Sequence, residues 1–200
     1  MKRIYCLICL CVLAGCNTIQ EKKTSALETV LEQATGIDAD IDNLKNTGSN
    51  KAEIDISDDG LNLNERFNNG FATITAAKEV ISLTITREEN GQDNILLGFT
   101  GPDLTQMRPI EGRMNKSGEN SMSFATAKYE KNEADMMMAF EVEGEIISLK
   151  PEQTVIRLKG QLGYAADAQT PGKWKAFAGT ITLNYPVFQA LGSAKEDFIY

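Results

Sequence analysis

The absence of histidine sets the first limit on the chemistry of this chain. None of its 200 residues is histidine. Ser-His-Asp and Cys-His catalysis, histidine-ligated zinc and histidine-based pH sensing all require an imidazole. We also find no G-x-S-x-G nucleophile motif and no glycine-rich phosphate loop. An enzyme would have to use carboxylates, lysines or tyrosines, and we predict a protein that is not an enzyme, with no catalytic residues and no cofactor.

The most orderly carboxylates are Glu141, Glu143 and Glu145, which alternate with other residues along one segment. Two carboxylates can hydrolyse a glycosidic bond, so a carboxylate-based glycan hydrolase is one alternative function. Arg157 and Lys159 have the same i, i+2 spacing in the next strongly alternating segment. We favour a cross-strand ladder of opposite charges on a solvated strand face, which stabilises by about 0.2 to 1 kcal/mol per pair.

A short acidic segment could bind calcium. Asp55, Ser57, Asp59 and Gly60 resemble the opening of an EF-hand loop, with oxygen ligands at alternate positions and glycine at the sixth. The twelfth position is Arg66, where the loop needs a bidentate glutamate. We therefore predict an ordinary Asp-Gly hairpin turn and no metal site.

Two groups of larger side chains could bind a ligand. Met136, Met138 and the apolar residues that alternate with the glutamates after them predict the inward face of a strand, although a lipid carrier would line its cavity in the same way. Trp174 lies after a loop that follows Tyr164. An exposed tryptophan and tyrosine suit stacking on a sugar ring or a protein partner, whereas the alternative is a half-buried aromatic at a strand end. We name Tyr164 and Trp174 as the candidate ligand-binding residues.

The first sixteen residues have the pattern of an export signal. Two basic residues and an apolar run at 4–13 precede Leu13-Ala14-Gly15-Cys16. Ten residues of helix span about 15 Å, roughly half the hydrocarbon thickness, so the run is too short for a permanent transmembrane helix. The tetrapeptide resembles the bacterial lipobox. That resemblance implies that residues 1–15 are removed and that Cys16 is the lipid-attachment residue, bearing several acyl chains that anchor it durably.

The residue after the cysteine bears on the destination. Asn17 stands where an aspartate would resemble the signal for retention in the inner membrane. The resemblance to exported lipoproteins therefore implies the outer membrane, and we expect a lipid-anchored domain that faces the periplasm, with the cell surface as the alternative. The other three cysteines lie within the removed segment, so the mature chain would contain no disulfide.

The mature chain would be acidic. The whole sequence has a formal net charge of −8, and loss of Lys2 and Arg3 with the signal leaves 18 basic against 28 acidic residues, a charge of −10. This charge opposes binding to nucleic acid. The expected partners are the lipid bilayer through Cys16 and an envelope protein or glycan.

The hydrophobic pattern changes along the chain. Residues 16–24 read as a lipidated tether, and 25–50 as a short helix and linker, because apolar residues from Leu27 to Ala34 share one helical face. From residue 51 the apolar period becomes two, and this alternation predicts a β domain at 51–187 and a C-terminal tail at 188–200.

The alternating segments define the expected fold class. They include Ile54 and Ile56, Leu61 and Leu63, Ile81 to Ile85, Ile95 to Phe99, Met136 to Val142, Ile156 to Leu162, and Phe177 to Tyr185, while 101–120 reads as a long loop. We predict an all-β fold, an antiparallel sandwich or barrel of about eight to ten strands preceded by one short N-terminal helix. The expected function is non-catalytic binding or scaffolding, and a closed-barrel carrier of lipid or another apolar ligand is an alternative.

Overall fold

The computed structural model describes residues 49–87, 93–102, 104–114, 120–130, 133–192 and 195–200. All of them belong to one compact unit, Asp42–Tyr200. The predicted helix at 25–34 and the export signal lie outside the described residues.

The described residues are mostly β, as the alternation predicts. One ten-stranded sheet contains all the strands. In chain order they are β1 (Lys51–Asp58), β2 (Phe71–Ala77), β3 (Val80–Thr86), β4 (Asn94–Thr100), β5 (Ile110–Arg113), β6 (Ser121–Glu130), β7 (Glu133–Leu149), β8 (Gln153–Tyr164), β9 (Lys175–Asn184) and β10 (Val187–Leu191). The helical elements of this part are α3 (Leu63–Phe67) and three single 3₁₀ turns, η3 (Ala165–Asp167), η4 (Pro171–Lys173) and η5 (Lys195–Asp197).

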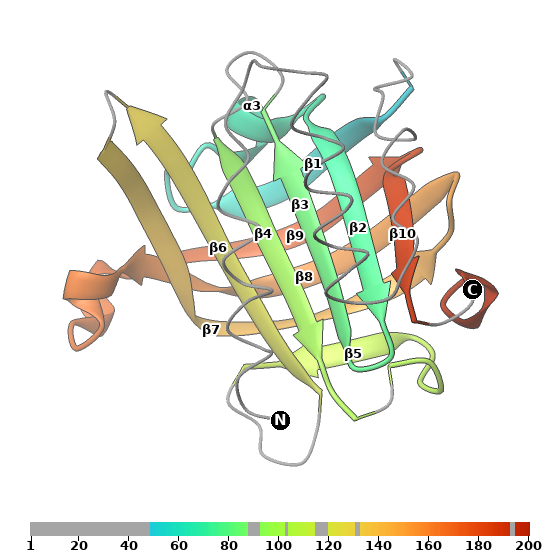
Figure 1. Cartoon of the computed structure of the whole chain (residues 1–200). Helices are drawn as coiled ribbons and strands as arrows, with labels where there is room; N and C mark the ends of the chain where they lie inside the picture. The colour runs from blue at the N-terminus through green and yellow to red at the C-terminus, as the bar shows by residue number, and fades with distance from the viewer. Residues whose placement is uncertain (1–48, 88–92, 103, 115–119, 131–132, 193–194) are drawn as a thin grey trace. The chain divides into compact units, whose positions relative to one another are not determined.

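The sheet is mixed rather than purely antiparallel. Its strand order is β1-β9-β8-β7-β6-β4-β3-β2-β10, with β5 paired to β7. β10 runs parallel to β2, whereas the other paired strands are antiparallel. The prediction of a wholly antiparallel sheet is therefore wrong at this edge. The reason is topological. After β9, which is next to one end of the strand order, the chain crosses to the other end and enters β10 beside β2 (Figure 1).

The sheet curls into a half-barrel, so that two sets of strands face each other (Figure 1). We call β2, β3, β4 and β6 the threonine-rich half, and β1, β9, β8, β5 and the C-terminal part of β7 the charged half. β7 belongs to both, because Glu133–Met138 pairs with β6 and Glu143–Ile146 pairs with β5. Two β-bulges in β7 help it to bend from one half into the other.

Helix α3 packs against β1, which is an edge strand of the sheet. The side-chain Oδ1 atoms of Asn64 and Asn68 accept hydrogen bonds from the backbone N–H groups of Ile56 and Ile54, at 2.9 and 2.5 Å. These two asparagines are four residues apart, so they lie on one side of the helix. They satisfy donors that β1 would otherwise leave unpaired at the edge of the sheet.

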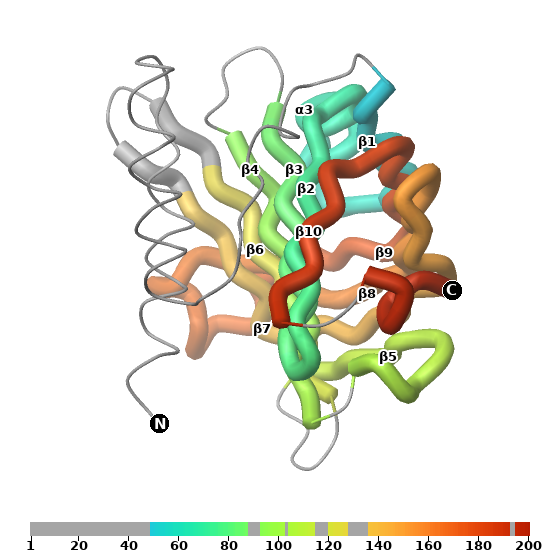
Figure 2. Tube along the Cα trace, turned by 45° about the vertical axis from the view of Figure 1, so that its right-hand side comes forward, coloured from blue at the N-terminus to red at the C-terminus, as the bar shows by residue number. Residues whose placement is uncertain are grey.

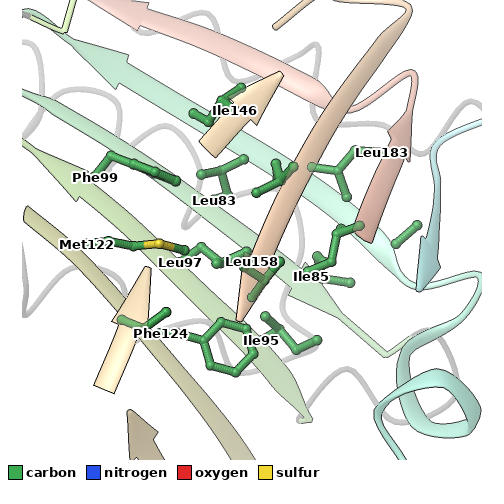
Figure 3. Packing of buried hydrophobic residues seen from close by; sticks show 14 of the residues in the cluster. Leu83, Ile85, Ile95, Leu97, Phe99, Met122, Phe124, Ile146, Leu158 and Leu183 are labelled. Carbon is green, nitrogen blue, oxygen red and sulfur yellow. The ribbon is translucent and has the colours of Figure 1, made fainter. Parts of the chain in front are cut away.

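The core fills the space between the two halves. Figure 3 shows Leu83, Leu97 and Phe99 of the threonine-rich half facing Ile146 and Leu158 of the charged half. One row of the charged half is made entirely of buried isoleucines that are opposite one another in the register: Ile54, Ile181, Ile156, Ile146 and Ile110. Branched side chains stacked in this way fit the pleated surface closely.

The next inward row of the charged half is rich in glycine. It contains Ile56, Gly179, Leu158, Gly144 and Gly112 in register. A Cβ at Gly112 would lie 2.9 Å from Cδ1 of Phe99, and one at Gly144 would lie 3.0 Å from Sδ of Met122. The large side chains of the threonine-rich half therefore fill the space that the glycines leave.

One predicted strand is replaced by a helix. Leu61 and Leu63 alternate as the residues of a strand would, but Leu63 is the first residue of α3. The side chains that α3 buries in the core are Leu63 and Phe67. The i, i+4 spacing of Leu63 and Phe67 satisfies the helical period equally well. The predicted hairpin turn at Asp59-Gly60 is also wrong, because the antiparallel partner of β1 is β9.

The two segments predicted to lack strands each contain one. β5 lies within the predicted loop at 101–120, and β10 begins at the end of the predicted β domain and extends into the predicted tail. The tail also contributes Tyr200, whose hydroxyl accepts a hydrogen bond from Ile110 N at 3.0 Å and donates to Ile146 O. In Figure 2 these last residues lie near β5, and the backbone of Tyr200 pairs with that of Leu149 at the end of β7.

Candidate functional site

The outward face of the charged half carries two rows of charged side chains that cross β5, β7 and β8. In the first row, three residues are opposite one another in the register: Glu111, Glu145 and Arg157. The second row contains Arg113, Glu143 and Lys159. Arg157 Nη1 donates to Glu145 Oε1 at 2.7 Å, and Lys159 Nζ lies 2.7 Å from Glu143 Oε1. The predicted ladder of opposite charges between β7 and β8 is confirmed.

Glu143 lies between two cations. Its Oε2 atom pairs with Arg113 Nη2, while its Oε1 atom pairs with Lys159. The hydrogen bond from Lys159 is the largest effect on the Glu143 carboxyl and lowers its pKa. Desolvation acts in the opposite direction, and the positive charges of Arg113 and Lys159 add to the lowering. Glu143 is therefore ionised at neutral pH. A general acid requires the opposite shift, because it must hold a proton at the pH of the reaction.

These rows line a groove of about 940 Å³. The volume lies in the range of small-ligand sites. Besides the six charged residues, the lining consists of Pro102, Met107, Gly112, Asn120, Gly144, Leu158, Ala178, Gly179 and Thr180. The groove therefore joins β5, β7, β8 and β9 with the segment that connects β4 to β5.

Small side chains on β9 leave room beside the charged rows. Ala178 is opposite Lys159 and Thr180 is opposite Arg157, so short side chains stand next to long ones. Gly179 lies between them in sequence, and a Cβ there would be 2.1 Å from the backbone O of Asp55. The close packing of β1 against β9 thus depends on glycine at this position.

Six groove residues lie in the segment 101–120 that the sequence predicts as a loop: Pro102, Met107, Glu111, Gly112, Arg113 and Asn120. Glu111 and Arg113 extend outward from β5, and Met107 precedes it. The signal that could have identified β5 is the alternation of Ile110 and Gly112 with two charged residues. Four residues are too few for this pattern to stand out beside the glycines and prolines around it.

The two predicted ligand-binding residues lie outside the groove. Trp174 is half-buried: its ring centroid is 4.8 Å from that of Phe140, and its indole N–H donates to Asp167 O at 2.9 Å. Gly163 of β8 lies against both rings, since a Cβ there would be 2.7 Å from Phe140 and 3.2 Å from Trp174. Tyr164 is 42% exposed, and strand alternation directs it to the face opposite Gly163. Tyr164 ends β8 and Trp174 immediately precedes β9, and the two residues belong to opposite faces of the sheet.

Met136 and Met138 face outward from the sheet, which is opposite to the prediction. Met136 is 46% exposed and Met138 is half-buried, whereas Met137 is buried in the core. The prediction that Met136, Met138, Phe140 and Val142 share the inward face is wrong, because Phe140 is an extra residue in β7. Ala139 is opposite Leu162, and Glu141 is opposite the next residue, Gln161. Such a bulge reverses which residues face inward.

In the acidic segment that resembles a calcium loop, the carboxylate of Asp58 accepts hydrogen bonds from the backbone. Its Oδ1 atom accepts a hydrogen bond from Leu61 N at 2.7 Å, and its Oδ2 atom accepts one from Leu63 N at 3.0 Å. Asp59 Oδ2 accepts from Ala176 N at 3.2 Å. These carboxylates hold the turn into α3 and the start of β9. Within the described ranges, no three acidic or cysteine side chains come together as a metal site.

Cys16, the predicted lipid-attachment residue, lies outside the described residues. Among the helices that the structure describes, none is long and apolar enough to cross a membrane.

Comparison with known proteins provides no family for this chain: no protein-family model, no curated protein and no solved structure matches it significantly.

Proposed function

We propose that this chain is a cell-envelope lipoprotein, anchored through Cys16, whose β domain binds a ligand or partner in the groove of the charged half without catalysing a reaction on it. The observation that carries the proposal is the state of the groove carboxylates. Glu143 and Glu145 are each ion-paired to cations of the same groove. Such carboxylates can accept hydrogen bonds from a ligand, but they are poorly placed to donate a proton.

The anchoring part of the proposal rests on the lipobox resemblance of Leu13-Ala14-Gly15-Cys16. Lipid on Cys16 would place the β domain next to a membrane in the envelope, and we propose the outer membrane because Asn17 follows the cysteine. The predicted tether at 16–24 and the predicted short helix and linker at 25–50 would separate the proposed anchor from β1.

The packing of the sheet does not favour a carrier. A carrier would need a cavity between the two halves, lined by Met136 and Met138. Both of these side chains point away from the core, and the space between the halves is filled by buried residues such as Phe99 and Met122. The groove lies on the outward side of the charged half instead.

Fatty-acid labelling tests the anchor. The full chain expressed in a bacterium should incorporate labelled palmitate and sediment with membranes, and Cys16→Ser should lose both properties. A Cys9→Ser variant is the matched control, because it changes a cysteine in the removed segment. If the wild-type protein carries no lipid, the anchoring proposal is wrong.

Turnover assays test the non-catalytic part. Any compound that binds the wild-type protein should be recovered unchanged after prolonged incubation. Recovery of a hydrolysed product, together with its loss in Glu143→Gln or Glu145→Gln, would contradict the proposal and support the glycan hydrolase.

A further inference from the structure

We propose that the groove of the charged half binds a neutral saccharide, and that Arg113, Glu143, Glu145, Arg157 and Lys159 form its hydrogen-bonding wall. This inference rests on the proposed non-catalytic binding function and names the chemical class of the ligand. Four properties of the groove support it.

The first property is the charge balance of the lining. The groove contains three cationic residues, Arg113, Arg157 and Lys159, and three carboxylates, Glu111, Glu143 and Glu145. Its formal charge is therefore zero, in a chain whose net charge is −8. A charged ligand would be attracted to one set of groups and repelled by the other, whereas a neutral polar ligand meets no such opposition.

The second property is unused hydrogen-bonding capacity. A guanidinium has five N–H donors and an ammonium has three, and each carboxylate can accept about four hydrogen bonds. The ion pairs join Arg157 Nη1 to Glu145 and Lys159 Nζ to Glu143, and the side chains of both cations are more than half exposed. Several donors and lone pairs thus remain for a ligand. A sugar hydroxyl both donates and accepts, so it can bond to both members of one ion pair.

The third property is the spacing of the two ion pairs. Arg157 and Lys159 are two residues apart on β8, and so are Glu145 and Glu143 on β7. Two residues of an antiparallel strand span about 6.8 Å, so equivalent donor–acceptor pairs recur along the groove. The hydroxyl groups of a saccharide chain recur in a similar way. Because the ion pairs already hold the side chains in place, little rotamer freedom is lost when a ligand binds.

The fourth property is the apolar part of the lining. Met107 is 41% exposed, and Pro102 and Ala178 also contribute to the groove. A sugar ring presents C–H groups as well as hydroxyls, and these uncharged surfaces can cover them. Trp174, which the sequence analysis names as a candidate ligand-binding residue, is absent from the lining.

Binding measurements on the full-length lipidated protein in detergent micelles test the inference. The probes are neutral glucose, mannose, galactose and N-acetylglucosamine oligomers of several units, with a sulfated oligosaccharide and inorganic phosphate as anionic probes. At least one neutral oligomer should bind, and its affinity should change less than about twofold between low and high salt, because screening acts on charged ligands. Arg157→Gln and Lys159→Gln should each weaken binding by about tenfold, the effect of losing one good hydrogen bond to a charged group.

Lys173→Gln is the matched control. Lys173 Nζ pairs with Asp167 Oδ1 at 2.7 Å, an exposed ion pair of the same type that lies outside the groove lining. This variant should bind the oligosaccharide as the wild type does, and urea unfolding should show all three variants to be folded.

Three results would overturn the inference: no neutral oligomer binds, the groove variants bind as tightly as Lys173→Gln, or only the anionic probes bind. Hydrolysis of a bound oligomer would instead reject the non-catalytic function and leave the saccharide site in place. Loss of saccharide binding alone leaves the lipid anchor untouched, because palmitate labelling measures the anchor separately.

Discussion

The two halves of the sheet contribute side chains of opposite size to the shared core. The threonine-rich half directs large side chains inward, including Phe99, Met122 and Phe124, and carries small uncharged residues such as Thr73, Thr84 and Ser123 on its outward face. The charged half places glycines at several inward positions and charges on its outward face. The large residues of one half fill the space above the glycines of the other. Neither half therefore has a complete core by itself.

The outward faces differ for a related reason. In the charged half, Glu143 and Glu145 are opposite Lys159 and Arg157, so cross-strand attraction contributes to the pairing of β7 with β8. In the threonine-rich half, β-branched residues such as Thr73 and Thr84 are opposite each other and favour the strand conformation through their shape. The outward face of the charged half should therefore respond to pH.

The largest expected effect comes from removing a large inward side chain of the threonine-rich half. Phe99→Ala should lower the free energy of unfolding by about 3 to 5 kcal/mol, because Phe99 is fully buried over Gly112 and its loss leaves a cavity. Urea denaturation followed by circular dichroism measures the change. The control is Met136→Ala, which should cost less than about 0.5 kcal/mol because Met136 is exposed. A similar loss for both variants would place Met136 back in the core.

The next effect comes from filling the glycine row. Gly112→Ala should destabilise the protein by about 1 to 3 kcal/mol, since the new methyl group would meet Phe99 Cδ1 at 2.9 Å and Met122 Cβ at 3.0 Å. Gly172→Ala is the control, because nothing lies within 4 Å of its Cβ position. The double variant Gly112→Ala with Phe99→Leu tests the contact between halves directly. If the two changes in unfolding free energy are additive, Phe99 and Gly112 do not share the space as described.

A smaller effect is expected at Tyr200, which joins β5 to β7 within the charged half. Tyr200→Phe should cost about 1 kcal/mol at neutral pH, because its hydroxyl bonds to Ile110 N and Ile146 O. Burial raises the pKa of Tyr200 above its ordinary value of 10.0. The folded state therefore favours the neutral hydroxyl. The contribution of this hydroxyl to the free energy of unfolding is present below pH 10 and is lost as the pH rises through the raised pKa. Tyr200→Phe should lose less stability than the wild type as the pH is raised above 10. Equal slopes of unfolding free energy against pH in alkaline solution would contradict this prediction.

The smallest effect is expected at Glu143 on the outward face. The pKa of the Glu143 carboxyl in the folded protein is lowered from 4.5, chiefly by the Lys159 hydrogen bond. The contribution of this carboxylate to the free energy of unfolding is therefore present above the ordinary carboxyl pKa and is lost as the pH falls through the lowered value. Glu143→Gln should therefore lower the free energy of unfolding slightly at neutral pH and leave it nearly unchanged in acid, so that stability falls less on acidification than in the wild type. Thermal unfolding between acidic and neutral pH measures this, with Glu65→Gln on α3 as the comparison. An unchanged acid limb in Glu143→Gln would mean that the ladder does not hold this carboxyl ionised.

Much of the fold could be predicted from local pattern. The alternation in Ile81 to Ile85, Ile95 to Phe99 and Ile156 to Leu162 corresponds to β3, β4 and β8, with the expected residues inward. The period fails in β7, where the bulge at Phe140 exchanges the two faces and a second one near Ile147 exchanges them again. A bulge is stabilised by the bend of the whole sheet, and no local pattern marks it here.

The candidate site was only partly predictable. The i, i+2 spacing of Glu143 with Glu145, and of Arg157 with Lys159, was sufficient to predict the ladder. Arg113 could not be added to it, because its place beside Glu143 depends on β5 pairing with a segment thirty residues later in the chain. Pairing over such a distance depends on the free energy of the complete sheet.

Composition and local pattern were enough to set the chemical limits of this protein and most of its secondary structure. The lack of histidine excludes imidazole chemistry, and a two-residue period of apolar side chains sustained over several residues predicts strands, as at Ile81 to Ile85, whereas the single pair Leu61 and Leu63 lies at the start of a helix. Only the tertiary structure decided which strands pair, which face of β7 meets the core, and which charges surround the groove. The physical reason is that alternation specifies two faces of a strand, while burial against the opposite half decides which face lies inside.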